Sequence, residues 1–318
     1  FQAEDGIRDS SVTGFRRVLF RSFADGQALS QPGSSAYINV PEPELITQTN
    51  VIAQSKWGNP SNVVMAGAHL DSVQAGPGIN DNGSGSAAIL EVAEQMAKVK
   101  PTNAVRFAWW GAEESGLVGS NEYVAGLSEA EKDKIALYLN FDMVGSPNHV
   151  FFVYDGDDSD KTGAGAGPEG SAQIEKTFEA FYTRVGEPFK GTDFSGRSDY
   201  GAFIANGIPS GGLFTGAEGV KTADEAALWG GTAGQQYDPC YHLACDTYAN
   251  NNDHALDVNS DAIGFSVLQY AMNTSDINGL PGKGNFPVLS GAKSPAAGAN
   301  LTGGGGLHDH DHAPTHTE

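Results

Sequence analysis

Imidazole and carboxylate side chains recur in short motifs along the middle of the chain, and these residue types can do chemistry together. They are His69, Asp71, Asp81, Glu113, Glu114 and Asp142. Several carboxylates gathered at one place repel one another, so such a group persists when a multivalent cation neutralises it. Imidazole with carboxylate ligands and no thiolate suits zinc, with manganese or cobalt as alternatives.

Each motif alone has an ordinary structural role. A His-x-Asp pair is commonly a solvated strand end, Asp-Asn-Gly is commonly a turn, and adjacent glutamates often begin an exposed helix. The glycines and serines at 83–88 also fit a dinucleotide fingerprint, but residues 69–82 separate them from the preceding strand, which that motif does not allow. The sequence contains neither His-Glu-x-x-His nor Gly-x-Ser-x-Gly, so a single-zinc protease and a serine hydrolase are not indicated.

The apolar pattern predicts the elements that must position these residues. We expect strands at 63–68, 105–110, 135–141, 150–154 and 209–214. We expect helices at 85–98, 121–125, 172–185 and 256–273. Alternating strands and helices predict an α/β fold with a mainly parallel sheet and helices on both faces. Because parallel strands end at the same edge of a sheet, the motif residues that follow them should meet there.

Five motifs together resemble one protein family. They are GAHLDS at 67–72, GINDNGSG at 78–85, FAWWGAEE at 107–114, NFDM at 140–143 and CYH at 240–242. In this order they are similar to the secreted bacterial double-zinc aminopeptidases, relatives of aminopeptidase Y and of glutamate carboxypeptidase, from about residue 62 to 273. The resemblance implies a phosphorylase/hydrolase-like three-layer sandwich that binds two zinc ions and removes the first residue of peptides with a free N-terminus.

The same resemblance assigns the metal ligands. It implies that His69 and Asp142 hold one zinc ion, that Glu114 and His242 hold the other, and that Asp81 bridges both. Asp71 would orient His69, as carboxylates behind ligating histidines usually do.

Further roles concern the reaction and the substrate. Glu113 would be the general base, and Tyr241 would donate a hydrogen bond to the oxyanion. Arg197 matches a position that contacts a carboxylate of substrate or product, and Phe214 matches a wall of an apolar pocket, so large apolar first residues are the expected preference. Glu113 and Asp142 would also recognise the free amine.

A structural calcium site is a further expectation from the resemblance, with Asp257 and Asp261 as its ligands. Two other functions stay open at this point: a single-zinc acyl cyclotransferase of the same superfamily, and a non-catalytic receptor-like ectodomain. Retention of every expected ligand position argues against both.

The cysteines bear on the compartment. Cys240 and Cys245 could form a local disulfide, half of a metal knuckle, or two separate thiols, and the second pair that an all-cysteine zinc site needs is absent. We expect a disulfide, which would hold the loop that carries Tyr241 and His242. A disulfide implies an oxidising compartment, so we expect a secreted protein, although no signal peptide is present in this sequence.

Composition limits the partners and the domains. The net charge of −21 repels nucleic acid and anionic lipid, and no apolar run reaches the length of a membrane span. We expect a monomer.

Residues 1–22 hold four of the seven arginines and resemble translated DNA-sequencing adapters, with a basic arm or a targeting segment as the alternatives. We therefore expect an N-terminally truncated catalytic domain at 23–276 and a flexible Gly-rich tail at 277–318 that ends in alternating His and Asp.

Overall fold

The computed structural model describes residues 23–35, 46–161, 163 and 165–279. Contacts divide the chain into two compact units, one that includes Phe1–Thr47 and one that spans Gln48–His312. In the first unit, Phe23–Leu29 form helix α2. The adapter-like segment 1–22 and the His/Asp-bearing end of the tail lie outside the described residues, so both interpretations stay predictions.

The second unit is built on a seven-stranded sheet with the order β1-β3-β2-β4-β7-β5-β6. Its strands are β1 (Val51–Gln54), β2 (Asn59–His69), β3 (Asn103–Trp110), β4 (Ile135–Phe141), β5 (Phe152–Tyr154), β6 (Lys190–Thr192) and β7 (Ser210–Phe214). Strand β2 is parallel to both β3 and β4, β4 is parallel to β7, and β5 is parallel to β6. Only β1 with β3 and β5 with β7 pair antiparallel among these strands, so the predicted mainly parallel sheet is confirmed.

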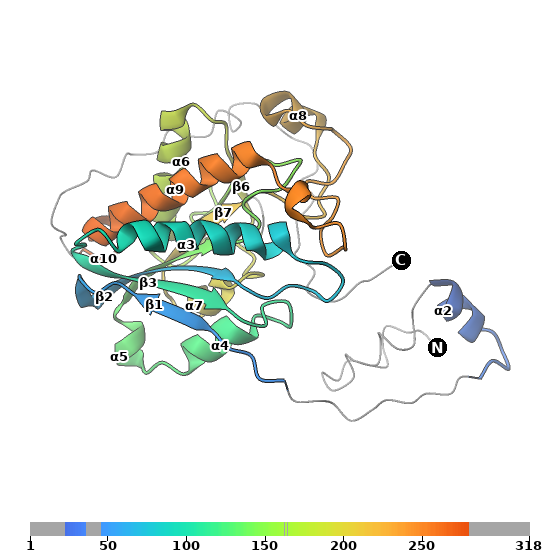
Figure 1. The fold of residues 1–318 in the computed structure, drawn as a ribbon, viewed down its shortest axis with the longest axis horizontal. Helices are drawn as coiled ribbons and strands as arrows, with labels where there is room; N and C mark the ends of the chain where they lie inside the picture. Colours follow the sequence, from blue (N-terminus) through green and yellow to red (C-terminus); the bar gives the residue numbers. More distant parts are fainter. Residues whose placement is uncertain (1–22, 36–45, 162, 164, 280–318) are drawn as a thin grey trace. The chain divides into compact units, whose positions relative to one another are not determined.

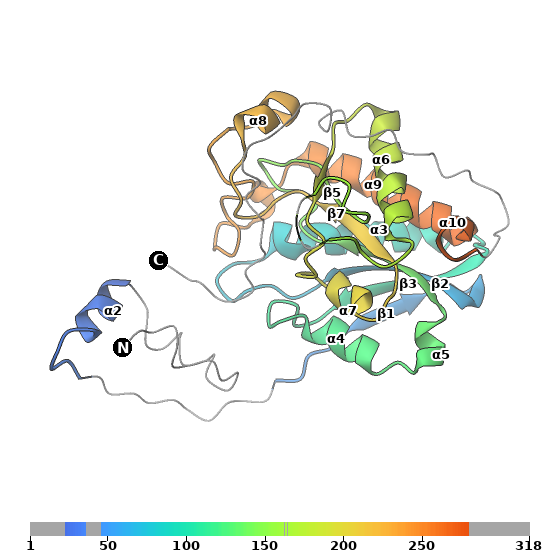
Figure 2. The same cartoon turned by 180° about the vertical axis from the view of Figure 1, so that it is seen from behind.

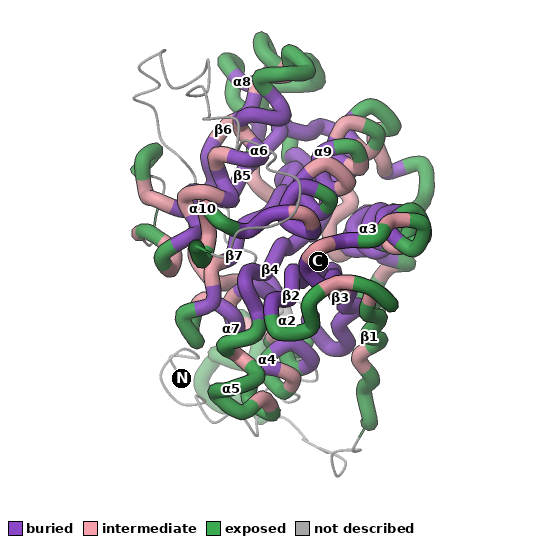
Figure 3. The backbone as a smooth tube through the Cα atoms, turned by 90° about the vertical axis from the view of Figure 1, so that its left-hand side faces the viewer, coloured by how far each residue is buried: buried purple, intermediate pink, exposed green. Residues whose placement is uncertain are grey.

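Helices cover both faces of this sheet (Figures 1 and 2). The described helices of this unit are η2 (Ile79–Ser84), α3 (Gly85–Met96), α4 (Val118–Ala125), α5 (Glu129–Lys132), α6 (Ser171–Val185), α7 (Tyr200–Ile204), α8 (Ala223–Trp229), η3 (Tyr248–Asn250), α9 (Asp253–Met272) and α10 (Ser275–Asn278). Figure 3 shows the central strands as buried, whereas β1 and most of α8 are exposed.

Alternation along β2 separates two apolar cores. Val64 and Ala66 point to the face that packs against α3, α6 and α9. Val63 and Met65 point to the opposite face, which contacts α4 and α7. Both faces of β2 are therefore apolar, as is typical of a central parallel strand, and its polar residues are confined to its ends.

The predicted long elements are present, and the differences lie in short ones and at boundaries. Strands β1 and β6 and helices α5, α7 and α8 were not predicted. The predicted tail is wrong at its first two residues, Ile277 and Asn278, because α10 includes both. Asn278 Nδ2 donates to Asn62 Oδ1 at 2.7 Å, which attaches this helix to the start of β2.

None of the described helices combines the length and the apolar character that a membrane span needs.

Candidate metal centre

The motif residues gather at the carboxyl ends of three adjacent strands. His69 is the last residue of β2, Asp142 directly follows β4, and Glu113 and Glu114 follow β3 after a short turn. Asp81 lies in η2, which leads into α3. Because β3, β2 and β4 are neighbours in the sheet, the parallel arrangement brings these side chains to one edge, as predicted.

Asp81 lies between the two histidines, with one carboxylate oxygen toward each. His69 Nε2 is 3.2 Å from Asp81 Oδ1 and 3.1 Å from Asp142 Oδ1. His242 Nε2 is 3.1 Å from both Asp81 Oδ2 and Glu114 Oε2. The five side chains therefore form two sets of potential ligands that share Asp81.

Electrostatics in the centre favour bound cations. Burial disfavours the charged form of His69, but Asp142 and Glu113 outweigh burial and raise its pKa well above the usual value. Burial is likewise outweighed at His242, where contacts with Asp81 and Glu114 raise the pKa to about 10. In the metal-free protein, protons on the two imidazoles are the countercharge of the carboxylates, and a metal ion would replace them.

The donor set fits zinc. Imidazole nitrogen and carboxylate oxygen are its ordinary ligands, and no thiolate is available because both cysteines are oxidised. The four carboxylates of Asp81, Glu113, Glu114 and Asp142 carry a formal charge of about −4, which two divalent cations would cancel and one would not. The side chains of Asp81, Glu114 and Asp142 are at most 6% exposed, so their negative charges need a countercharge, which protons on the histidines or bound cations can supply.

Asp71 supports both His69 and the glutamates. Its backbone carbonyl lies 2.9 Å from His69 Nδ1, whereas its carboxylate oxygen Oδ1 lies 3.8 Å away. The carboxylate instead accepts hydrogen bonds from the backbone N–H groups of Glu113 at 3.0 Å and Glu114 at 3.3 Å. The predicted contact with His69 is thus made chiefly by the main chain, while the side chain fixes the segment that carries the two glutamates.

Glu113 is fully buried and lies beside the first ligand set. Its carboxylate, His69 and Asp142 each offer an atom within 4.8 Å of the others, and Asp81, Glu114 and His242 do the same. Geometry therefore allows Glu113 to act either on a water near the metals or as a ligand, and a substitution must separate the two roles.

The loop that carries Tyr241 and His242 is closed by the predicted disulfide. Cys240 and Cys245 are bonded with Cα atoms 5.3 Å apart, which confirms the pairing and excludes a metal knuckle. The Tyr241 ring stacks on the His242 imidazole with centroids 3.8 Å apart. Burial, Asp81 and Glu114 raise the pKa of Tyr241 well above its usual value, so its hydroxyl keeps its proton and can donate.

Residues that sequence reasoning missed hold the ligand loops in place. Asp246 accepts hydrogen bonds from the backbone N–H groups of Asn80 at 2.9 Å and Asp81 at 3.0 Å, and thereby ties the disulfide loop to the bridging aspartate. Ser198 Oγ donates to Asp142 Oδ2 at 2.7 Å. Beside it, burial and the charge of Glu113 raise the pKa of Asp199 well above its usual value.

The expected substrate and calcium residues lie in different parts of the fold. Arg197 is half-buried in the loop before α7, next to Ser198. Phe214 ends β7 in the apolar core, where its ring packs on Phe152 with centroids 6.0 Å apart. Asp257 and Asp261 are exposed on α9, and within the described part of the chain neither belongs to a group of three potential ligands.

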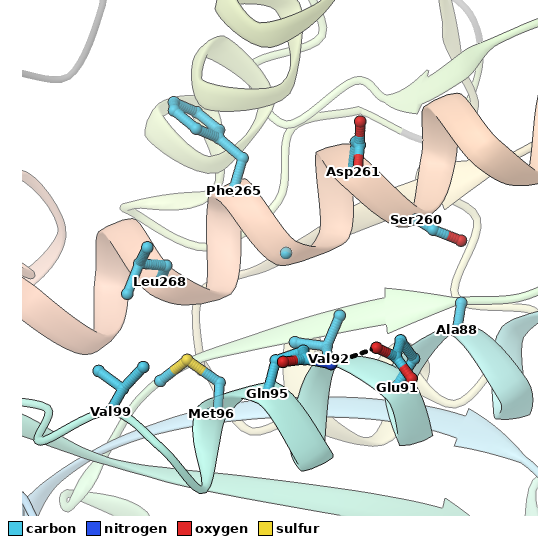
Figure 4. A pocket seen from close by; sticks show the side chains of 11 residues that line it. Ala88, Glu91, Val92, Gln95, Met96, Val99, Ser260, Asp261, Phe265 and Leu268 are labelled. Carbon is cyan, nitrogen blue, oxygen red and sulfur yellow. Dashed lines mark hydrogen bonds between the residues drawn. The ribbon is translucent and has the colours of Figure 1, made fainter.

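A groove of about 400 Å³ runs between α3 and α9 (Figure 4). Apolar side chains of both helices line it, among them Val92 and Met96 of α3 and Phe265 and Leu268 of α9. No ligand candidate of the metal centre lines it, so we assign it no part in the chemistry.

Comparisons with known proteins agree with this geometry. Residues 50–267 match the model of a family described as Peptidase family M28. An aminopeptidase of Pseudomonas aeruginosa strain UCBPP-PA14 is 53% identical over 270 residues, which cover 84% of this chain and 50% of that protein. Leucine aminopeptidase 2 of Trichophyton equinum is 52% identical over 253 residues, which cover 79% of this chain and 51% of that protein. The structure of BSAP, a zinc aminopeptidase from Bacillus subtilis, superposes with a TM-score of 0.56 at 26% identity. The superposition covers 72% of this chain and 52% of that one. The chain spans about half the length of the curated relatives it matches.

Proposed function

The chain belongs to peptidase family M28, and we propose that it is an aminopeptidase that binds two zinc ions and hydrolyses the first peptide bond of substrates with a free N-terminus. The observation that carries the proposal is the position of Asp81 between two sets of ligands. His69 and Asp142 would hold one ion, and Glu114 and His242 would hold the other. Family membership and the names of the relatives support the activity.

Bound zinc supplies Lewis acidity, which polarises a scissile carbonyl and lowers the pKa of a water molecule. The remaining steps belong to the chain's own residues. Glu113 takes a proton from the attacking water and passes it to the leaving amine, and its buried position keeps bulk water away from that transfer. Tyr241 donates its hydroxyl proton in a hydrogen bond to the oxygen that becomes negative.

Recognition of the substrate follows from charge. The free α-amine is cationic, and the carboxylates of Glu113 and Asp142 are the groups proposed to attract it. Arg197 is proposed to contact a carboxylate of substrate or product. The proposed preference for large apolar first residues, with Phe214 as one pocket wall, is supported by the relatives named leucine aminopeptidase.

Location and assembly belong to the same proposal. The disulfide supports a site of action in an oxidising compartment, so we propose secretion. We expect a monomer, which sedimentation velocity would check. A calcium site at Asp257 and Asp261 is not part of this proposal, because both residues are exposed and, among the described residues, neither belongs to a group of three His, Cys, Asp or Glu ligands.

A panel of amino-acid p-nitroanilides tests the activity. Purified protein is assayed with zinc on leucine, phenylalanine, alanine, glutamate and lysine p-nitroanilides, each with a free and an N-acetylated amine. We expect hydrolysis of the free-amine substrates, fastest for leucine or phenylalanine, and at least 100-fold slower hydrolysis of the acetylated ones. Equal rates on free and acetylated substrates would exclude an aminopeptidase. A glutaminyl peptide assayed beside the panel tests the cyclotransferase alternative, which its cyclisation, without hydrolysis of any p-nitroanilide, would favour.

A further inference from the structure

A continuous chain of hydrogen bonds runs behind Asp142, from the interior of the sheet to the metal centre. Trp110 Nε1 donates to Tyr138 Oη at 2.8 Å, and Tyr138 Oη donates to Asn140 Oδ1 at 3.0 Å. Asn140 Nδ2 then donates to Ser198 Oγ at 2.8 Å, and Ser198 Oγ donates to Asp142 Oδ2 at 2.7 Å. The other carboxylate oxygen of Asp142, Oδ1, faces His69. We refer to Trp110, Tyr138, Asn140 and Ser198 as the relay.

The two ends of the relay fix the direction of every bond in it. An indole N–H can only donate, and an ionised carboxylate can only accept. Between Trp110 and Asp142, each hydroxyl must therefore accept from one neighbour and donate to the next. Burial, together with Asp199, raises the pKa of Tyr138 well above its usual value, so its hydroxyl keeps the proton that the arrangement requires.

The fold makes room for the relay and holds it rigidly. Tyr138 and Asn140 are two positions apart on β4, so their side chains point to the same face of the sheet. Phe203 of α7 stacks on the Tyr138 ring with centroids 3.9 Å apart and planes within 1° of parallel. A Cβ at Gly67 of β2 would overlap both Tyr138 Oη and Trp110 Nε1, so glycine is needed there for reasons of space.

The relay is a polar path through an otherwise apolar core. Trp110 and Tyr138 are fully buried among Met65, Ala108 and Phe203, and Asn140 and Ser198 are each only 1% exposed. A buried polar network is costly unless every member is satisfied, and apolar residues of similar size could fill the same space. The relay ends on one carboxylate oxygen of Asp142, a proposed zinc ligand. This indicates that the relay has a role at the metal centre.

We propose that Trp110, Tyr138 and Asn140 are positioning residues that act through Ser198 to fix the orientation of the Asp142 carboxylate, with Oδ1 directed at the site it shares with His69. This inference rests on the proposed function, because it assigns the relay to the zinc ion held by His69 and Asp142. A rigid carboxylate needs no reordering when the metal binds, so the relay raises the affinity of that site and fixes its geometry.

Tyr138→Phe tests the proposal, because it removes one hydroxyl and leaves the stack on Phe203 intact. Tyr154→Phe is the matched control: Tyr154 is buried in the same apolar core, and its hydroxyl has no hydrogen-bond partner among the described residues. Zinc affinity is measured by competition with a chelator, and the visible spectrum of the cobalt-loaded protein reports ligand geometry. We expect Tyr138→Phe to weaken one of the two sites about 10- to 100-fold and to change the cobalt spectrum, whereas Tyr154→Phe should match wild type in both.

A double-mutant cycle separates action through Ser198 from a general effect on packing. Ser198→Ala should weaken the same site, and Ser198→Thr, which keeps the hydroxyl, should restore it. In the Ser198→Ala background, Tyr138→Phe should have no further effect on zinc affinity, since the path to Asp142 is already broken. If Tyr138→Phe does not fold, Trp110→Phe replaces it in the cycle.

Three results would overturn the inference or its premise, and they can be told apart. Equal zinc affinity and equal cobalt spectra for Tyr138→Phe and Tyr154→Phe would refute the relay alone. Additive effects of Tyr138→Phe and Ser198→Ala would show that Tyr138 does not act through Ser198. A wild-type protein that binds no zinc, or binds it without hydrolysing leucine p-nitroanilide, would refute the proposed function first.

Discussion

Glu113→Gln replaces a buried carboxylate with a neutral amide of the same shape. The side chain is 0% exposed, and its backbone N–H donates to Asp71 Oδ1 at 3.0 Å, so the main chain should stay in place. Loss of a general base typically lowers kcat about 10²- to 10⁴-fold, which corresponds to about 3–5 kcal/mol of transition-state stabilisation. We expect a loss at the upper end of this range, because Glu113 would serve both proton transfers, with both zinc ions retained.

The same substitution should change the titration of two buried neighbours in the metal-free protein. Glu113 raises the pKa of buried Asp199, which means that the two carboxyl groups repel each other when both are ionised. A neutral amide removes that contribution and also the attraction by which Glu113 raises the pKa of His69, so in the metal-free variant the pKa values of Asp199 and His69 should both fall, which titration followed by NMR would measure. Glu122→Gln on the exposed surface of α4 makes the same change in net charge and should alter neither kcat nor these two pKa values.

The assay combines steady-state rates on leucine p-nitroanilide at saturating zinc with zinc content by elemental analysis of the same sample. A kcat within threefold of wild type would refute the role of Glu113 as the base. Loss of one zinc ion would show that Glu113 is a ligand, which its position beside His69 and Asp142 also allows, and the division of roles between Glu113 and Glu114 would then be wrong.

Three further predictions concern stability and the ends of the chain. Replacing both Cys240 and Cys245 with alanine opens a short loop, so we expect a loss of about 2 kcal/mol and a fall in Tm of roughly 4–8 °C by calorimetry; an unchanged Tm would show that the loop is held by other contacts. Burial and neighbouring aspartates raise the pKa of Glu175 from 4.5 to about 8, so the folded chain keeps a proton that the unfolded chain releases, and stability should fall as pH rises from about 4.5 to about 8. Glu175→Gln should therefore raise Tm at pH 8 and have little effect at pH 5, and equal effects at both pH values would contradict this. Deleting 280–318, which leaves α10 intact, should change neither zinc content nor the rate on leucine p-nitroanilide, and a loss of activity at limiting zinc would instead support metal loading by the tail.

Sequence alone predicts the long buried elements, because a buried strand or helix has a recognisable pattern of apolar residues. The strand at 135–141 is predicted with the bounds that β4 has, since all seven of its residues are buried. Strand β1 was missed because its four residues are exposed and show no apolar alternation. Helix α8 could have been found, since Thr222 and Glu225 form a capping box, a signal that needs no tertiary contact.

The ligand candidates could also be predicted from the sequence, because imidazole and carboxylate groups that recur in order at the ends of parallel strands are typical of a metal centre. Their supporting residues were not. Ser198 donates to Asp142, which lies 56 positions away in the sequence, and Asp246 accepts from the backbone of Asp81, which lies 165 positions away. A serine or an aspartate in a loop has many possible partners, and only the folded chain shows which one it contacts.

Zinc bound per folded chain, measured together with activity, tests the central claim most directly. Metal-free protein is titrated with zinc, and the bound metal and the rate on leucine p-nitroanilide are followed in the same samples. The position of Asp81 between His69 and His242 predicts two ions per chain, with full activity reached as the second binds. Saturation at one ion per chain, no binding, or two bound ions without hydrolysis of the free-amine substrate would contradict it.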